Sequence, residues 1–242
     1  MEKEKGYDLS KTTVGLVGVG HVGHAVIEAI RPLGVQILLN DPPQKEALRK
    51  AGKPHEFFLK MEELQEKCDI ISFHTPLITK GPYPTFHLAN KTFFNALKKQ
   101  PIIINTSRGA VVDNTDVLQA LKDGIIRDAI IDTWENEPNI NQELLNLIYI
   151  GTPHIAGYSA DGKANATRMA LTALCNHFHL PVTFQIRVPQ LPEEELPEPN
   201  LTETERALVL YNPHTDSLKL KSHPTMFEEL RGNYPLRREF IE

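Results

Sequence analysis

The sequence predicts an α/β protein with a doubly wound parallel sheet, followed by a small C-terminal α+β module. From Thr13 onward, short apolar runs rich in β-branched residues alternate with amphipathic stretches of helical period, the pattern of a sheet covered on both faces. A glycine-rich turn, GVGHVG, joins the first apolar run to the first helical stretch. A segment dominated by proline and glutamate separates this region from the last residues of the chain, and such a composition predicts a linker.

The expected elements of the sheet region alternate regularly along the chain. The predicted strands are VGLVG, VQILLN, DIISFH, PIIINT, AIIDTW and LNLIYIG, at 14–18, 35–40, 69–74, 101–106, 129–134 and 145–151. The predicted helices are VGHAVIEAIRPL, MEELQEKC, KTFFNALKK and NTDVLQALKDG, at 22–33, 61–68, 91–99 and 114–124. Right-handed connections between parallel strands leave few other arrangements.

The pattern changes after residue 154. Ser159 is expected to cap a long helix over residues 160–178, whose alanine content suits close packing. In the last part of the chain, ALVLY at 207–211 predicts a strand and residues 225–232 predict a helix. So short a module is expected to pack on the main domain or on a second subunit.

Composition excludes several classes of function. The formal net charge is −5 and basic residues are not clustered, which argues against a nucleic-acid partner. The N-terminus is charged, and no apolar run approaches the ~20 residues that span a bilayer, so we expect a cytoplasmic protein without membrane contact. The two cysteines are far apart, and His177 and His179 point to different helix faces, so no metal site is predicted.

The motif GVGHVG indicates a dinucleotide site because it follows a predicted strand and opens a predicted helix. Gly18 permits the tight turn, Gly20 lets the backbone approach a pyrophosphate, and Gly23 lets helix and sheet pack closely. The N–H groups of His21 and Val22, at the helix start, would face the anion. A glycine-rich turn without a ligand is the structural alternative.

Asp41 follows the second predicted strand and bears on the choice of cofactor. A carboxylate there accepts hydrogen bonds from the ribose hydroxyls and repels a 2′-phosphate, so NAD is favoured over NADP. The alternative is a solvated aspartate that starts a turn before Pro42.

Three further candidates have both a functional and a structural interpretation. Arg108, in INTSRGAVVDN, follows a predicted strand and could hold a substrate carboxylate, or it could pair with Asp113 or Asp116. Two carboxylates near the end of another strand, in IIDTWENEP, could act at the same edge or lie in a loop; they are Asp132 and Glu137. In GTPHIAGYS, His154 is either a satisfied core histidine or a proton-transfer group.

The order of the glycine turn, SRG, D-x-x-x-x-E-P and P-H-I-A-G resembles the NAD-dependent D-2-hydroxyacid dehydrogenase family, from about Tyr7 to about His179. The resemblance implies a Rossmann domain that binds NAD. It also implies catalytic roles for Arg108, Glu137 and His154: the histidine takes the 2-hydroxyl proton, the arginine binds carboxylate and carbonyl oxygens, and the glutamate orients the imidazole.

Two features, the GPY segment at 81–83 and GYSADGK at 157–163, resemble members that oxidise a small phosphorylated 2-hydroxy acid in pyridoxal phosphate synthesis. Carried over, Thr75, Asp132 and Gly157 would contact NAD, and Tyr158 would join Arg108 at the substrate. The resemblance divides the chain into an NAD-binding domain with a short N-terminal linker, an interdomain helix, a linker rich in proline and glutamate, and a dimerisation module, at 1–158, 159–180, 181–200 and 201–242.

The resemblance also implies a homodimer and places most of the substrate domain before this segment. We therefore expect the chain by itself to bind NAD and to turn over substrate slowly. The alternative in another class is a binding protein that senses the dinucleotide without catalysis.

Overall fold

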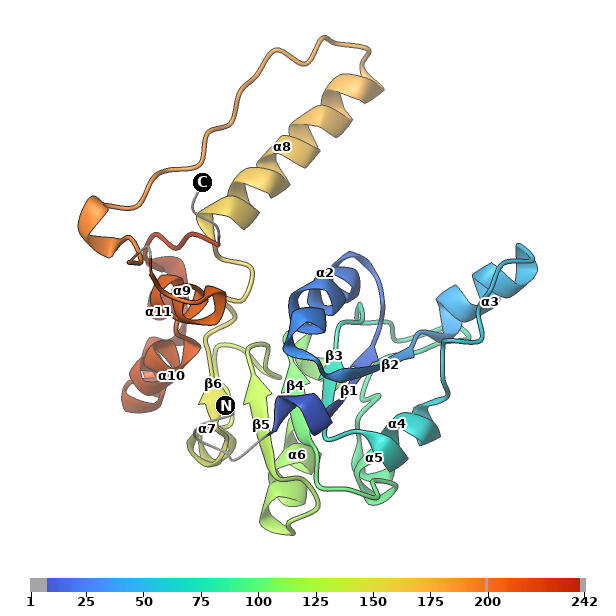
Figure 1. Ribbon diagram of the computed structural model, residues 1–242. Helices are drawn as coiled ribbons and strands as arrows, with labels where there is room; N and C mark the ends of the chain where they lie inside the picture. Colours follow the sequence, from blue (N-terminus) through green and yellow to red (C-terminus); the bar gives the residue numbers. More distant parts are fainter. Residues whose placement is uncertain (1–7, 199, 240–242) are drawn as a thin grey trace. The chain divides into compact units, whose positions relative to one another are not determined.

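The structure, a computed structural model, describes residues 8–198 and 200–239. The chain divides into two compact units, residues 1–151 and 152–242, and each is described by itself (Figure 1).

Unit 1 contains the predicted parallel sheet, which the structure confirms. Its six strands lie in the order β2-β1-β3-β4-β5-β6, and every neighbouring pair is parallel. They are β1 (Thr13–Val17), β2 (Gln36–Asn40), β3 (Ile70–Phe73), β4 (Ile102–Asn105), β5 (Asp128–Ile131) and β6 (Ile150–Gly151). Val17 is in register with both Asn40 and Phe73. The residues that follow these three strands therefore meet at one edge of the sheet.

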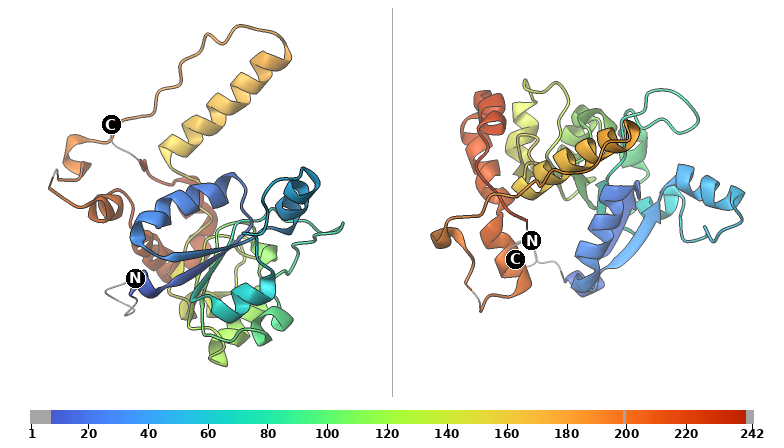
Figure 2. Two further views of the ribbon diagram at one scale, coloured as in Figure 1. Left: turned by 45° about the vertical axis from the view of Figure 1, so that its right-hand side comes forward. Right: turned by 90° about the horizontal axis from the view of Figure 1, so that it is seen from above.

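The helices of unit 1 cover both faces of the sheet. They are α2 (His21–Ile30), α3 (Pro42–Lys50), α4 (Met61–Lys67), α5 (Lys91–Asn95), α6 (Asn114–Lys122) and α7 (Gln142–Leu147). The chain moves from β1 to β2 in one direction and from β2 through β6 in the other. Right-handed connections then place α2 on one face and α4 to α6 on the opposite face, as Figures 1 and 2 show.

The core of unit 1 lies between these helices and the sheet. Its fully buried side chains include Leu16, Ile71, Phe73, Phe94, Ile102 and Ile103. Each such side chain stabilises the fold by about 1.5–3 kcal/mol relative to exposure. The runs that predicted β1, β3 and β4 are therefore apolar because both of their faces are covered.

Two segments of unit 1 differ from the prediction. Residues 42–50 form α3, because the Asp41 carboxylate accepts the N–H of Gln44 and two prolines occupy the first turn, where their missing N–H groups cost nothing. The last strand is shorter than expected. Leu145 and Leu147 belong to α7, which Asn141 caps by accepting the N–H of Leu144.

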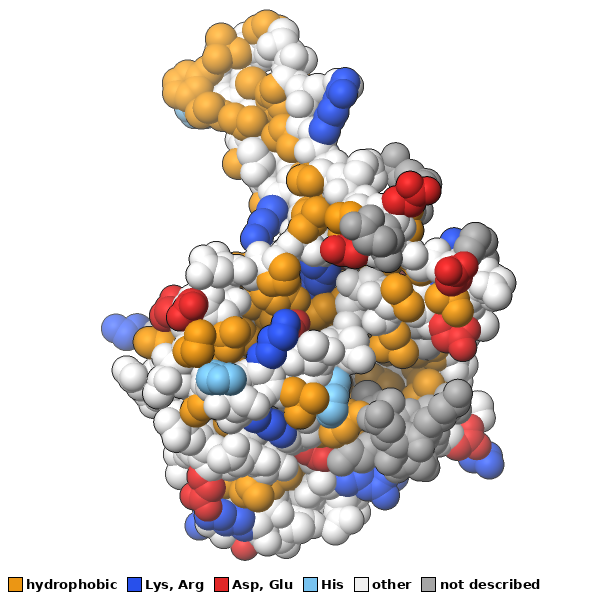
Figure 3. Space-filling model, turned by 90° about the vertical axis from the view of Figure 1, so that its left-hand side faces the viewer, with side chains coloured by type: hydrophobic (Ala, Val, Ile, Leu, Met, Phe, Trp, Pro, Cys, Tyr) orange, Lys and Arg blue, Asp and Glu red, His pale blue; other side chains and the backbone are white. Residues whose placement is uncertain are grey.

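Unit 2 begins with the predicted long helix. The Ser159 side chain accepts the N–H of Gly162 at 2.9 Å and so caps α8 (Ala160–His177), which confirms the expected cap. Five further elements follow: η4 (Glu193–Glu195), α9 (Glu203–Leu210), α10 (Pro213–Ser222), η5 (Pro224–Met226) and α11 (Phe227–Gly232). Apolar side chains gather at the far end of α8 and on the segment after it (Figure 3).

The strand predicted at 207–211 is wrong, and so is the α+β character of the C-terminal module over residues 201–239. Thr202 and Glu205 form a capping box, with the threonine hydroxyl and the glutamate carboxylate each satisfying a backbone N–H. That box starts a helix through Leu210, and it outweighs the strand preference of Val209 and Tyr211.

Candidate functional site

A cavity of about 880 Å³ lies at the carboxyl ends of β1, β2 and β3 in unit 1. This is the point where the chain reverses its direction across the sheet, and ligands of open α/β sheets bind there. The cavity brings together four of the residues predicted to bind the cofactor: Gly18, Gly20, Asp41 and Thr75.

The three glycines of the turn have different steric surroundings. Gly18 has a φ of +89°, and a Cβ there would lie 2.8 Å from the carbonyl oxygen of His74. A Cβ on Gly23 would lie 2.4 Å from the carbonyl oxygen of Gly18. A Cβ on Gly20 would meet nothing within 4 Å. Gly18 and Gly23 are therefore required by the fold, whereas Gly20 leaves open space beside the cavity.

The start of α2 has no side-chain cap. His21 and Val22 are its first residues, and Gly20 stands at the N-cap position. Backbone N–H groups in this position attract an anion through their own hydrogen bonds and through the helix dipole. The space beside Gly20 and the uncapped helix start fit the pyrophosphate of a dinucleotide.

Asp41 is tied into the site from two sides. One carboxylate oxygen accepts the N–H of Val19 at 2.8 Å, and the other accepts the N–H of Gln44 at 3.0 Å. The Gln44 amide also donates to the Val19 carbonyl at 2.5 Å. Asp41 is therefore fixed against the glycine turn rather than solvated, and sequence reasoning missed Gln44. Among the described residues, the basic side chains that line the cavity are Lys45 and Lys60, and no arginine does.

Two polar atoms in the cavity wall lack partners, namely Nδ1 of His74 and Oγ1 of Thr75. The other ring nitrogen of His74 is 2.9 Å from the hydroxyl of Ser72. Burial lowers the pKa of His74 to about 4, so the ring is neutral at physiological pH. Unsatisfied polar atoms next to a cavity fit a polar ligand such as NAD. The position of His74 directly after β3 is the sequence signal for its place in the cavity wall.

The GPY segment forms part of the outer wall of this cavity. The Thr85 hydroxyl donates to the Pro76 carbonyl at 2.5 Å and accepts the N–H of Ile78 at 2.7 Å. The Tyr83 hydroxyl donates to Glu46 of α3 at 2.5 Å. These contacts shape residues 76–85 into a closed loop against α3.

Arg108 lies outside this cavity, in the loop after β4. Its guanidinium is exposed and, among the described residues, donates only to the Ser107 carbonyl, at 2.6 Å. Asn105 holds the loop by donating to the carbonyl of Arg108 at 3.0 Å. The alternative ion pair is wrong, because Asp113 contacts His87 and Asp116 accepts the N–H of Lys91. The guanidinium therefore retains the capacity to hold a carboxylate.

Asp132 and Glu137 occupy the loop after β5. Asp132 is buried, and its N–H donates to the Asn105 carbonyl at 3.0 Å. One Glu137 oxygen accepts the N–H of Trp134 at 2.7 Å. A Cβ on Gly109 would lie 1.8 Å from the carbonyl oxygen of Trp134. The loops that follow β4 and β5 are therefore packed directly against one another.

The remaining predicted residues, His154, Gly157 and Tyr158, belong to unit 2. His154 has a φ of +55°, a left-handed conformation that is uncommon in residues other than glycine and that clusters at functional sites. Its N–H donates to the Thr152 carbonyl at 3.0 Å. Tyr158 is half-buried, and its N–H donates to the Ile155 carbonyl at 2.9 Å. The sharp turn over residues 152–158 leads directly into α8.

Residues 8–198 and 200–239 contain neither a metal-binding cluster nor a membrane-spanning helix. No group of three or more His, Cys, Asp or Glu side chains could hold a metal ion. No helix combines the length and hydropathy needed to cross a membrane.

Residues 1–156 match the family model "D-isomer specific 2-hydroxyacid dehydrogenase, NAD binding domain". The chain belongs to this family. The NAD-binding assignment agrees with the cavity at the switch point of the sheet.

Two relatives of this chain carry a name that is more specific than that of the family, namely erythronate-4-phosphate dehydrogenase. An erythronate-4-phosphate dehydrogenase of Bacteroides fragilis is 50% identical over 239 residues, which are 99% of this chain and 67% of the relative. That of Bacteroides thetaiotaomicron is 52% identical over 227 residues, 94% of this chain and 63% of the relative. The chain thus spans about two thirds of the length of these relatives.

A solved structure supports the assignment of the chain to the 2-hydroxyacid dehydrogenase family. The NAD-complexed D-isomer specific 2-hydroxyacid dehydrogenase of Lactobacillus delbrueckii ssp. bulgaricus is 26% identical to this dehydrogenase, with a TM-score of 0.58. The match covers 74% of this chain and 58% of that one.

Proposed function

We propose that the protein oxidises 4-phospho-D-erythronate to its 2-oxo acid with NAD. The observation that carries this proposal is the 50% identity to an erythronate-4-phosphate dehydrogenase over 99% of the chain. The cavity beside the glycine turn supports the cofactor part of the proposal, and the exposed guanidinium of Arg108 supports the carboxylate part.

Residues of unit 1 would hold the cofactor. The open space beside Gly20 and the N–H groups of His21 and Val22 would take the pyrophosphate, and Asp41 would take the adenosine ribose. Thr75, Asp132 and Gly157 are proposed as further contacts. When bound, NAD supplies the hydride acceptor of the reaction.

The chemistry of the substrate would rest on three side chains. Arg108 would bind the carboxylate through two parallel hydrogen bonds, which its planar fork permits. His154 would take the proton from the 2-hydroxyl group as the C2–H bond breaks. Glu137, which the N–H of Trp134 holds in place, would orient and stabilise the imidazolium. Tyr158 is proposed to contact the other end of the substrate.

We also propose that the protein forms a homodimer through unit 2. Leu208 and Val209 on α9 are 52% and 53% exposed, and Met169 and Phe178 on and after α8 are 69% and 59% exposed. Large apolar side chains at this exposure favour association.

The direct test is the appearance of NADH when the purified chain is mixed with NAD and 4-phospho-D-erythronate. We expect slow turnover, and we expect His154→Asn to lower kcat by ~10² or more with little change in NADH affinity. Arg108→Lys should mainly raise KM, since an ammonium cannot reproduce the bidentate fork. NADH binding with no turnover above that of His154→Asn would overturn the proposal and favour a protein that senses the dinucleotide without catalysis.

A further inference from the structure

Unit 2 contains a cavity of about 440 Å³ whose charged lining is entirely basic. Lys163, Arg187 and Arg237 line it together with Tyr158 and Tyr234, and no aspartate or glutamate among the described residues does. A concave site with cations and no carboxylate attracts anions, because the low-dielectric walls concentrate the positive potential.

Two consecutive arginines show that one buried cation here lacks a counter-charge. Arg237 and Arg238 are each 6% exposed. The Nε of Arg238 donates to the Asp161 carboxylate at 2.9 Å. Arg237 donates through Nη2 to the carbonyls of Ile155 and Ala156, at 3.2 and 2.8 Å, and its Nη1 has no partner.

A buried cation without a carboxylate is costly to the fold. Nothing in the described part of the chain neutralises Arg237. Its Cζ lies 4.0 Å from the ring centroid of Tyr211 and 5.5 Å from that of Tyr234. Cation–π contacts of this kind offset part of the cost but leave the hydrogen-bonding capacity of Nη1 unused. Arg237 therefore has a structural reason to meet an anion.

Two cations lie near the Tyr158 ring, and one of them, Lys163, also lines the cavity. Lys163 Nζ lies 4.6 Å from its centroid and Arg231 Cζ lies 5.7 Å from it. The Nε of Arg231 is also buried without a partner. Two mutually repelling cations at one ring are stabilised when an anion lies between them. Tyr158 lines the cavity, so both cations near its ring lie close to the cavity.

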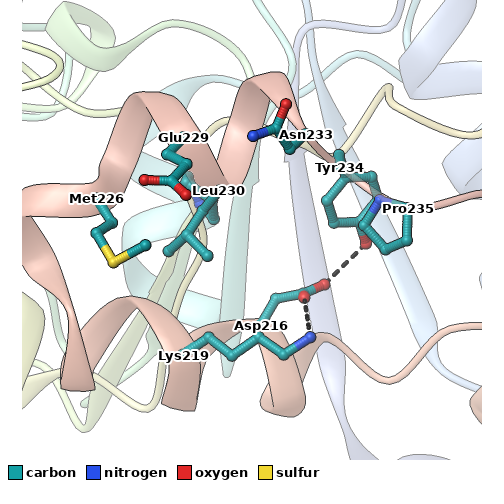
Figure 4. Close-up of a pocket in the computed structure, with 9 residues that line it drawn as sticks. Asp216, Lys219, Met226, Glu229, Leu230, Asn233, Tyr234 and Pro235 are labelled. Carbon is teal, nitrogen blue, oxygen red and sulfur yellow. Dashed lines mark hydrogen bonds and ion pairs between the residues drawn. The ribbon is translucent and has the colours of Figure 1, made fainter.

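A neighbouring cavity of about 190 Å³ provides a contrast within the same unit (Figure 4). Asp216 and Glu229 line it together with one cation, Lys219, which is 3.9 Å from Asp216. The Tyr234 hydroxyl donates to Asp216 at 2.8 Å. Burial, followed by this hydrogen bond, raises the pKa of Tyr234. The described lining of this cavity therefore carries two carboxylates and one ammonium, whereas the described charged lining of the 440 Å³ cavity is basic only.

We propose that the basic cavity of unit 2 binds the phosphate group of a phosphorylated small molecule, with Arg237 and Lys163 as the principal donors and Arg187 at its rim. A doubly charged phosphate with several acceptor oxygens matches converging guanidinium and ammonium groups better than a single carboxylate does. The identification of this phosphate with that of 4-phospho-D-erythronate rests on the proposed function. Free inorganic phosphate has the same chemistry, so the test must separate the two.

Calorimetric titration of the 242-residue chain without cofactor tests the site. Three probes are used: 4-phospho-D-erythronate, D-erythronate and inorganic phosphate. We expect the phosphorylated acid to bind at least tenfold more tightly than D-erythronate, and its affinity to fall with added salt. Inorganic phosphate should compete for the same site.

Variants locate the binding. Lys163→Gln removes an exposed ammonium and should weaken the phosphorylated acid at least tenfold. Arg237→Lys keeps the charge but loses the fork, and should also weaken it; circular dichroism checks its folding. Lys219→Gln is the matched control, because it removes an ammonium from the neighbouring cavity that Asp216 and Glu229 line. It should leave the affinity for the phosphorylated acid unchanged.

The outcomes separate the site from the proposed function. Equal affinity for the phosphorylated and unphosphorylated acids, or no loss in Lys163→Gln, would overturn the phosphate site even if NAD-dependent turnover were observed. Phosphate binding that Lys163→Gln weakens, without any turnover, would support the site and refute the proposed function. Inorganic phosphate binding as tightly as the phosphorylated acid would support the site but overturn its assignment to the substrate.

Discussion

The imidazole of His87 lies between two carboxylates, with Nε2 2.7 Å from Glu135 and Nδ1 3.1 Å from Asp113. Glu135 also accepts the N–H of Asn114 at 2.8 Å. His87 therefore ties the loop after β3, which forms part of the cavity wall, to the start of α6 and to the loop that carries Glu137.

Loss of this tie should destabilise unit 1. The three side chains are 28%, 18% and 20% exposed for His87, Asp113 and Glu135, so solvent screens the contacts only in part. His87→Gln should lower the free energy of unfolding by about 1–3 kcal/mol, as expected for charge-assisted hydrogen bonds. Urea unfolding measures this. His55→Gln is the control, because Glu56 beside it is largely exposed; an equal loss in both variants would contradict the role of the tie.

Two glycines of the turn should respond differently to alanine. Gly20→Ala places a Cβ in open space, so the protein should fold normally while NADH affinity falls at least tenfold through a clash with the pyrophosphate. Gly23→Ala forces a Cβ to within 2.4 Å of the Gly18 carbonyl and should lower stability. Calorimetric NADH titration and urea unfolding measure the two effects. Unchanged NADH affinity in Gly20→Ala would place the pyrophosphate elsewhere.

Asp41 should determine the preference for NADH over NADPH. In Asp41→Ala the gap between the two affinities should narrow, because the carboxylate that repels a 2′-phosphate is gone. The same change removes the cap of α3 and should cost about 1 kcal/mol of stability. Asn141→Ala removes the cap of α7 instead and serves as a control for capping alone. If both variants kept the wild-type preference, Asp41 would not contact the ribose.

Stability should depend on pH through His74. Its pKa in the folded protein, about 4, lies below the ordinary 6.5. As the pH falls, the unfolded chain therefore binds a proton at this histidine before the folded chain does. The stability that the neutral ring contributes is fully present above about pH 6.5 and is lost as the pH falls towards 4. The slope is at most about 1.4 kcal/mol per pH unit, and partial exposure reduces it. In urea unfolding between pH 7 and 4.5, the free energy of unfolding of His74→Gln should decline less steeply with falling pH than that of the wild type. Parallel curves for the two proteins would refute the lowered pKa of His74.

Association through unit 2 should be visible by light scattering. We expect a dimer, and Leu208→Glu should shift it towards monomer because a charge on the exposed apolar face of α9 opposes burial. Lys219→Gln, on α10, should leave the molar mass unchanged. A monomeric wild-type chain at micromolar concentration would contradict the proposal.

Much of the sheet region followed from the sequence alone. The runs at β1, β3 and β4 are apolar on both faces, and GVGHVG stands between the first of them and a helix, so the parallel sheet and the position of the turn could be predicted. The capping of α8 by Ser159 was predictable for the same local reason, since a cap and the helix it starts lie within a few residues.

Tertiary structure decided the features that depend on residues far apart in the chain. Two such features are contacts between segments that are far apart in the sequence: that of Asp41 with Val19, and those of His87 with Asp113 and Glu135. The lack of a partner for Nη1 of Arg237 likewise depends on the folded surroundings of that side chain. A side chain's partners depend on loop paths and burial, which no local period or spacing encodes. The error at α9 has a different cause: ALVLY suits a strand by composition, but the local capping box of Thr202 and Glu205, which their spacing in the sequence indicates, starts a helix there.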